Sequence, residues 1–167
     1  MSGMAEEPES VRSVATPVSI TYGWTAGPGA SGYLHGLLAG RLVGNRCPVC
    51  HKVYLPRGSC PTCAVLLGET VELGDRGTVT SFCIVNVPFL GQRIPIPYVS
   101  ANIVVDGADI AFSHLLQECE ASEVRMGMRV EAVWRPPDEW GPSLENIRHF
   151  RPSGEPDAAF ETYAHHL

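Results

Sequence analysis

Two short motifs, Cys47-Pro-Val-Cys50 and Cys60-Pro-Thr-Cys63, decide the fold of this chain. In each motif, two cysteines three positions apart in a tight turn direct both sulfurs to one point, and two such turns complete a tetrahedron. Four thiolates that leave no open coordination position are typical of a structural zinc site. We therefore predict one structural zinc ion, held by Cys47, Cys50, Cys60 and Cys63.

Iron is the alternative metal for these ligands. A rubredoxin-type iron site uses the same four thiolates and would imply electron transfer. Rubredoxin-like turns usually carry glycine directly after the second cysteine of each motif. This chain has His51 and Ala64 at those positions, and we take this departure to favour zinc over iron.

The composition is that of a globular protein with an acidic balance. The 167 residues include 44% hydrophobic and 18% charged residues, with a formal net charge of −6. Without a run of basic residues, the chain lacks the positive charge that nucleic-acid binders use to contact phosphates. A single-stranded nucleic-acid-binding protein is therefore the competing function class and not the preferred one. The sequence contains neither an apolar stretch of about 20 residues nor a signal peptide, so we expect a cytoplasmic protein without a membrane partner.

The N-terminal part, residues 1–32, is expected to be a flexible arm. Residues 1–16 are acidic and polar and predict disorder, whereas residues 17–24 alternate and predict an extended strand. The side chains on the apolar side of this strand are Val18, Ile20, Tyr22 and Trp24. Because the Gly-rich residues 25–32 form a loose tether, the strand either folds back on its own domain or docks on another chain.

A short helix is predicted over residues 33–42, directly before the first cysteine motif. Its leucines recur at helical spacing, and Gly44 is a plausible stop. We assign residues 33–68 to this helix and the four-cysteine ribbon.

The pattern after the ribbon is that of β-structure. Strands are predicted at Val71–Leu73, Thr78–Val87, Tyr98–Val105, Ile110–Leu115, Met128–Arg135 and Ile147–Arg151, with a helical turn at Ala121–Met126. Five short strands with one small helix are typical of an OB-fold barrel. The predicted fold is therefore mainly β, with an N-terminal helix and zinc ribbon (33–68), a five-stranded OB barrel (69–151) and an irregular tail (152–167).

This arrangement resembles the DUF35 family of zinc-ribbon, OB-fold, acyl-CoA-associated proteins. The resemblance rests on Leu42–Cys50, Pro56-Arg57, Cys60–Cys63, Gly77-Thr78-Val79 and Gly127–Val130, and it covers residues 33–151. Family members are companions of thiolase-superfamily enzymes, including lipid-transfer-type homologues. One branch is the C-terminal domain of MaoC-type enoyl-CoA hydratases of steroid side-chain breakdown, where it pairs with an aldolase. This chain is then either a free-standing member or such a domain by itself.

The resemblance implies an accessory subunit that shapes the substrate channel of a thiolase-like acyl-CoA enzyme and stabilises that enzyme. The expected partner is an aldolase that cleaves a steroid side-chain CoA thioester by a retro-aldol reaction, or a thiolase. The expected ligand at the shared site is an acyl-CoA or steroid-CoA.

The chain itself shows no complete set of catalytic residues. Cys83, Cys119 and His114 lie in strand-like contexts, where such side chains are usually structural. The apolar loop 88–97 either packs on its own ribbon or faces a partner or a CoA channel, where Arg93 meets a phosphate. The candidate contacts to a partner or acyl-CoA are Trp24, Leu37, Phe89, Leu90, Arg93 and His114.

Overall fold

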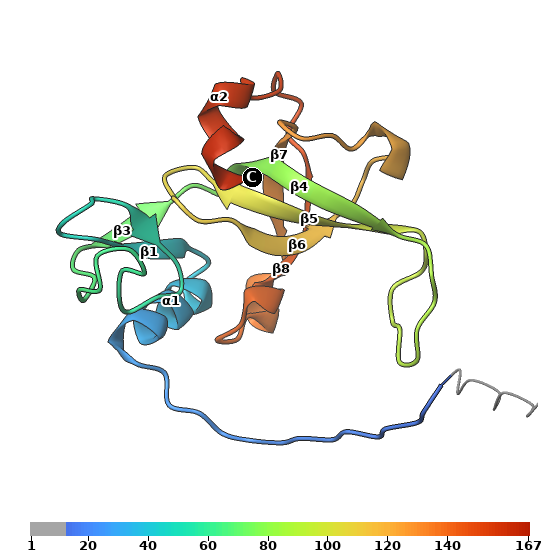
Figure 1. Cartoon of the computed structure of the whole chain (residues 1–167), viewed down its shortest axis with the longest axis horizontal. Helices are drawn as coiled ribbons and strands as arrows, with labels where there is room; N and C mark the ends of the chain where they lie inside the picture. The colour runs from blue at the N-terminus through green and yellow to red at the C-terminus, as the bar shows by residue number, and fades with distance from the viewer. Residues whose placement is uncertain (1–12) are drawn as a thin grey trace, which may run out of the picture.

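The structure, a computed structural model, describes residues 13–167, which form a small ribbon and a barrel (Figure 1). The ribbon contains helix α1 (Pro28–Leu38) and strands β1 (Leu42–Arg46), β2 (Val53–Tyr54) and β3 (Thr70–Leu73). The barrel strands are β4 (Arg76–Val85), β5 (Tyr98–Val105), β6 (Phe112–Leu116), β7 (Arg129–Trp134) and β8 (Ile147–Pro152). The short helical elements are η1 (Ala121–Glu123), η2 (Pro137–Glu139), η3 (Leu144–Asn146), α2 (Phe160–Tyr163) and η4 (Ala164–His166).

The predicted mainly-β fold with a closed five-stranded barrel is confirmed. The strands pair in the order β4-β5-β6-β8-β7, and β7 returns to β4. All described pairs in the barrel are antiparallel except β6 with β8, which meet in parallel at Leu116 and Phe150. The alternating residues of β5 point inward as predicted, because successive side chains of a strand face opposite sides of the sheet. Val99, Ala101, Ile103 and Val105 are each at most 4% exposed.

The ribbon and the barrel share one hydrophobic core. Leu37 of α1 and Val53 of β2 belong to the same buried cluster as Ile103 and Phe150 of the barrel. Hydrogen bonds also join the two units: the Val53 amide donates to Asp109 Oδ2 (2.8 Å), and the Asp109 amide donates to the Val53 carbonyl (2.9 Å). The ribbon is therefore held firmly against the end of the barrel.

The prediction for the helix was wrong at both ends. Helix α1 begins at Pro28, inside the predicted tether, because proline fits the first turn, where its missing N–H costs nothing. The helix ends at Leu38 rather than Leu42, and Gly40 supplies the left-handed backbone (φ +67°) that follows it. Gly44 is not a stop: it lies in β1, where a Cβ atom would be 2.7 Å from Val53 Cγ1.

Residues 17–24 do not form the predicted strand. In the described structure this stretch is extended but has no strand beside it, and strand structure requires a hydrogen-bonded neighbour (Figure 1). The predicted disordered segment 1–16 lies largely outside the described residues. Residues 13–27 form an exposed segment that we call the arm.

Two further segments differ from the predictions. The predicted boundary between the ribbon and the barrel lies at residues 68 and 69, but β3 pairs with β1 along Leu42–Asn45, so this strand belongs to the ribbon sheet. The tail was predicted to be irregular, yet it forms α2 and η4 and buries Tyr163 against Gly127. Within residues 13–167, no helix has the length and apolar character needed to cross a membrane.

Candidate metal centre and contact surface

The two cysteine motifs form two turns with the same hydrogen bonds. The His51 amide donates to the Cys47 carbonyl and the Ala64 amide donates to the Cys60 carbonyl, and the donor–acceptor distance is 3.0 Å in both bonds. Backbone amides also point at the sulfurs: the Cys63 amide lies 3.3 Å from Cys60 Sγ, and the Val49 amide lies 3.4 Å from Cys47 Sγ. Amide donors of this kind stabilise thiolates, because they place positive dipole ends beside the sulfur charge.

The residue after each motif adopts the backbone conformation that glycine favours. His51 has φ +62° and Ala64 has φ +54°, in the left-handed region that side chains rarely occupy. Both turns therefore keep the shape expected of rubredoxin-like turns even though glycine is absent. The departure at these two positions therefore does not by itself distinguish zinc from iron, and zinc stays a prediction.

The four predicted ligands come together. The Sγ atoms of Cys47, Cys50, Cys60 and Cys63 all lie within 4.8 Å of one another. All four cysteines are free, and the sulfurs of Cys50 and Cys60 are 3.7 Å apart, much farther than the roughly 2.05 Å of a disulfide. Metal–sulfur bonds of about 2.3 Å separate the sulfurs of a tetrahedron by about 3.8 Å, so this spacing fits a tetrahedral metal ion.

The electrostatics of the cluster favour a cation once all four sulfurs are ionised. Burial raises the pKa of Cys60, but the amides of Cys63 and Thr62 and the neighbouring thiols outweigh it and bring the pKa to about 6. Burial and the other thiols together raise the pKa of Cys63 to about 12. Four thiolates cannot coexist here at neutral pH unless a positive ion offsets their mutual repulsion. The cluster is therefore built to bind a metal ion.

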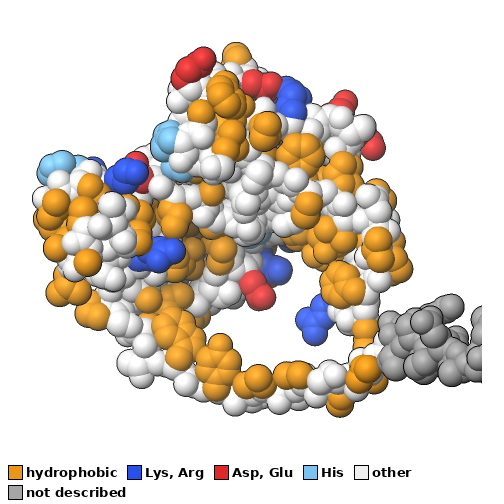
Figure 2. Space-filling view, in the orientation of Figure 1, with side chains coloured by type: hydrophobic (Ala, Val, Ile, Leu, Met, Phe, Trp, Pro, Cys, Tyr) orange, Lys and Arg blue, Asp and Glu red, His pale blue; other side chains and the backbone are white. Residues whose placement is uncertain are grey.

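The other candidate contact residues divide between the surface and the core. Trp24 on the arm is 64% exposed, Phe89 is 56% exposed and Leu90 is fully exposed on loop 86–97. Figure 2 shows hydrophobic side chains along much of the arm and the loop. Leu37 was a wrong choice, because its side chain is completely buried in the protein's own core.

Arg93 and His114 lie together on one open cavity of about 640 Å³, which we call the loop cavity. It lies between loop 86–97, strand β6 and the segment that leads into β8. The sequence interpretation missed Arg135 and Arg148, which line the same cavity. The only sequence signal was their position beside apolar strand residues, and this does not reveal which strands become neighbours.

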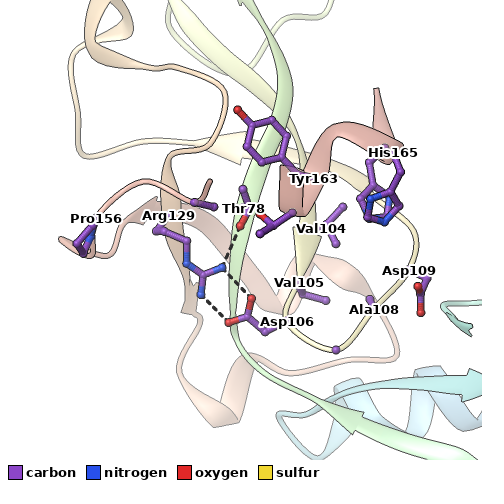
Figure 3. Close-up of a pocket in the computed structure, with 14 residues that line it drawn as sticks. Thr78, Val104, Val105, Asp106, Ala108, Asp109, Arg129, Pro156, Tyr163 and His165 are labelled. Carbon is purple, nitrogen blue, oxygen red and sulfur yellow. Dashed lines mark hydrogen bonds and ion pairs between the residues drawn. The ribbon is translucent and has the colours of Figure 1, made fainter. Parts of the chain in front are cut away.

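A second cavity of about 510 Å³ lies between the β5–β6 turn and the C-terminal tail (Figure 3). Its arginine, Arg129, is already engaged: it donates to both carboxylate oxygens of Asp106 (2.8 and 2.6 Å) and to Thr78 Oγ1 (3.0 Å). Asp106 raises the pKa of Arg129 further above its usual value. Arg129 Nε also donates to Glu155 Oε2 (3.1 Å), so the guanidinium joins the barrel to the tail and is not free to bind a ligand.

The fold is similar to that of two solved structures. One is described as "Ltp2-ChsH2(DUF35) aldolase": its chain is 24% identical, the TM-score is 0.56, and the match covers 74% of this chain and 93% of that chain. The other is a protein of unknown function from the DUF35 family of Sulfolobus solfataricus, with 19% identity, a TM-score of 0.56 and coverage of 76% and 85%. At these identities the likeness concerns the fold.

Sequence comparisons identify the family. Residues 70–135 match the family described as "ChsH2, C-terminal OB-fold domain". A DUF35 domain-containing scaffold protein of Methanocaldococcus jannaschii is 36% identical over 97 residues, which cover 56% of this chain and 67% of that protein. A protein of the same description from Pyrococcus furiosus is 30% identical over 95 residues, with coverage of 57% and 69%. With two relatives matched over two thirds of their length, this chain belongs to the DUF35 family.

Proposed function

We propose that this protein is an accessory subunit that binds a thiolase-superfamily enzyme of the lipid-transfer type, stabilises it and shapes its substrate channel. The partner would carry out the bond chemistry on an acyl-CoA, and we favour retro-aldol cleavage of a steroid side-chain CoA thioester. The observation that carries the proposal is the apolar surface of the arm and of loop 86–97. Two further observations support the class of partner. The relatives are described as scaffold proteins, and one structural neighbour is described as part of an aldolase.

Nine of the exposed apolar residues lie on the arm and on loop 86–97, which project from the two folded units. Their side chains are between one third and fully exposed: Val14, Val18, Ile20, Tyr22, Trp24, Val87, Phe89, Leu90 and Ile96. A soluble chain rarely leaves this much apolar surface in water unless another molecule covers it. Because aromatic residues are frequent anchors at the centres of interfaces, Trp24 and Phe89 are the expected anchors.

The metal centre has a structural role in this proposal. We infer that the bound ion is zinc, because its four thiolate ligands leave no open position for substrate and the chain offers no second redox group. Held by Cys47, Cys50, Cys60 and Cys63, zinc would cross-link the two turns of the ribbon. The ribbon in turn supports α1, from which the arm extends.

Co-expression with a thiolase-superfamily subunit from the same genome tests the proposal. Size-exclusion chromatography with light scattering should give a stable complex, expected to contain two copies of this chain and a partner dimer. An interface of obligate character buries about 2,000 Å² or more. Deleting residues 13–27, or changing Trp24 and Phe89 to Ala, should therefore weaken the complex.

The matched control is Phe160→Ala on α2. Phe160 is 55% exposed, almost the same as the 56% of Phe89, but it lies on the C-terminal helix, away from loop 86–97 (Figure 1). The control variant should assemble like the unmodified chain. An arm-deleted chain that assembles equally well would overturn the assignment of the arm as a docking segment.

The competing function is single-stranded nucleic-acid binding, which OB barrels often carry out. The chain's net charge of −6 argues against it, because such binding relies on many phosphate contacts from Lys and Arg. A rubredoxin-like electron carrier is the second alternative, and metal analysis distinguishes it from the zinc protein.

A further inference from the structure

The loop cavity is lined by both apolar and basic side chains. Ile94 and Leu115 line it from loop 86–97 and β6, and Leu144 and Ile147 line it from η3 and β8. Arg93, Arg135 and Arg148 also line the cavity, and its volume of about 640 Å³ is typical of small-molecule sites. Figure 2 shows basic side chains beside the open space between the barrel, the loop and the arm.

Two of the three arginines of this cavity, Arg93 and Arg148, differ from most others in the described part of the chain. Ion pairs with carboxylates occupy Arg41, Arg46, Arg76, Arg125, Arg129, Arg135 and Arg151. Within residues 13–167, the arginines without such a pair are Arg57, Arg93 and Arg148. In an acidic chain that pairs most of its arginines, two of the three unpaired ones line the same cavity.

The remaining polar groups leave the positive charge to the arginines. The Leu115 amide donates to His114 Nδ1 (2.9 Å), so a neutral His114 carries its proton on Nε2. Burial lowers the pKa of His114 and so favours the neutral ring, which adds no positive charge to the cavity. Glu145 brings one carboxylate to the lining, and its carbonyl accepts a hydrogen bond from Arg135 Nε (2.7 Å).

We propose that the loop cavity binds a phosphate-bearing small molecule, with Arg93 and Arg148 on the phosphate and the apolar part of the ligand on Ile94, Leu115 and Ile147. Arginine is suited to this role because its planar group donates two parallel hydrogen bonds to phosphate oxygens. The residues that line the cavity are by themselves the argument for a ligand that carries a phosphate. Identifying the ligand as the nucleotide part of an acyl-CoA rests on the proposed function.

Titration calorimetry on the isolated full chain tests the site. The probes are coenzyme A, adenosine 3′,5′-bisphosphate, inorganic phosphate and a single-stranded oligothymidylate. We expect saturable binding of the first two and weaker binding of inorganic phosphate, which lacks an apolar part. Arg93→Gln and Arg148→Gln should each weaken binding about tenfold, as expected for the loss of one charge-assisted contact.

Arg57→Gln is the matched control, because it removes the third unpaired arginine, which does not line the cavity. It should change affinity less than about twofold, since it removes only long-range charge. Circular dichroism would establish that all three variants are folded. The proposal would be overturned if calorimetry gave no saturable binding at millimolar probe concentration. It would also be overturned if the Arg57 variant lost as much affinity as the two cavity variants.

The other outcomes are equally decisive. Tight oligothymidylate binding that both cavity variants abolish would assign the cavity to nucleic acid instead. If the Arg93 and Arg148 variants weaken assembly with the partner but leave the binding of every probe unchanged, the two arginines form ion pairs at the interface and the cavity is not a phosphate site. Because the titration uses the chain alone, it succeeds or fails independently of complex formation, so failure of the site and failure of the proposed subunit role are distinguishable.

Discussion

Asn146 is the residue whose replacement should most clearly separate the ribbon from the barrel. Its side chain is only 2% exposed, on η3 directly before β8. Its Nδ2 donates to the Leu37 carbonyl at the end of α1 (2.9 Å) and to the Gly141 carbonyl (2.8 Å), and its Oδ1 accepts from the Gly141 amide (2.9 Å). This side chain therefore connects the ribbon helix to the barrel.

Asn146→Ala removes all three hydrogen bonds. Each contributes about 1 kcal/mol net, and a buried partner left unpaired costs about 1–3 kcal/mol. The Leu37 carbonyl keeps a second donor, the Gly40 amide at 3.1 Å, which limits the loss on that side. We expect the free energy of unfolding to fall by about 3 kcal/mol, and Tm to fall by about 6–12 °C for a chain of this size.

Asn102→Ala is the control for this variant. Asn102 Nδ2 donates to Ser81 Oγ (2.9 Å) and its Oδ1 accepts from Ser113 Oγ (2.5 Å), both on an exposed face of β5, where water replaces the lost bonds. Asn102→Ala should lower the free energy of unfolding by less than about 1 kcal/mol. Urea denaturation gives the two free energies, and hydrogen exchange shows where Asn146→Ala loosens the structure. Equal destabilisation by the two substitutions, or unchanged exchange in α1, would refute the reasoning.

Three further predictions concern the metal centre, the expected lack of catalytic activity and the surface ion pairs. Elemental analysis should find one zinc per chain, and chelation or Cys60→Ser should unfold the ribbon, because zinc binding supplies about 10–16 kcal/mol of folding free energy in such sites. Iron in equal stoichiometry, or an unchanged melting curve for Cys60→Ser, would contradict this. The isolated chain should not turn over acyl-CoA thioesters; turnover abolished by His114→Ala or Cys83→Ala would make it an enzyme in its own right. Arg129, with Arg76, holds the pKa of Glu155 below its usual value, so this carboxylate stabilises the fold above its unfolded pKa and loses that effect as pH falls through its folded pKa. Glu155→Gln should therefore reduce the fall of the free energy of unfolding at acid pH. A pH dependence of unchanged shape would refute this role of Glu155.

Local sequence determined the features that depend on near neighbours in the chain. Two cysteines three positions apart lie close together in a tight turn, and the repeat of this spacing at Cys47, Cys50, Cys60 and Cys63 predicted the cluster. Period-two alternation likewise predicted β5 (Tyr98–Val105) to the residue, since burial on one face of a strand leaves that pattern.

Tertiary structure decided the features that depend on distant partners. The alternation of residues 17–24 resembles that of β5, but no described strand lies beside them, so the arm remains exposed. Leu37 had the spacing of an apolar helix face, and only the tertiary structure shows that the chain's own core, rather than a partner, covers it. The loop cavity brings Arg93 and Arg148 together beside the neighbouring strands β6 and β8, and the pairing of strands, not spacing along the chain, makes these residues neighbours.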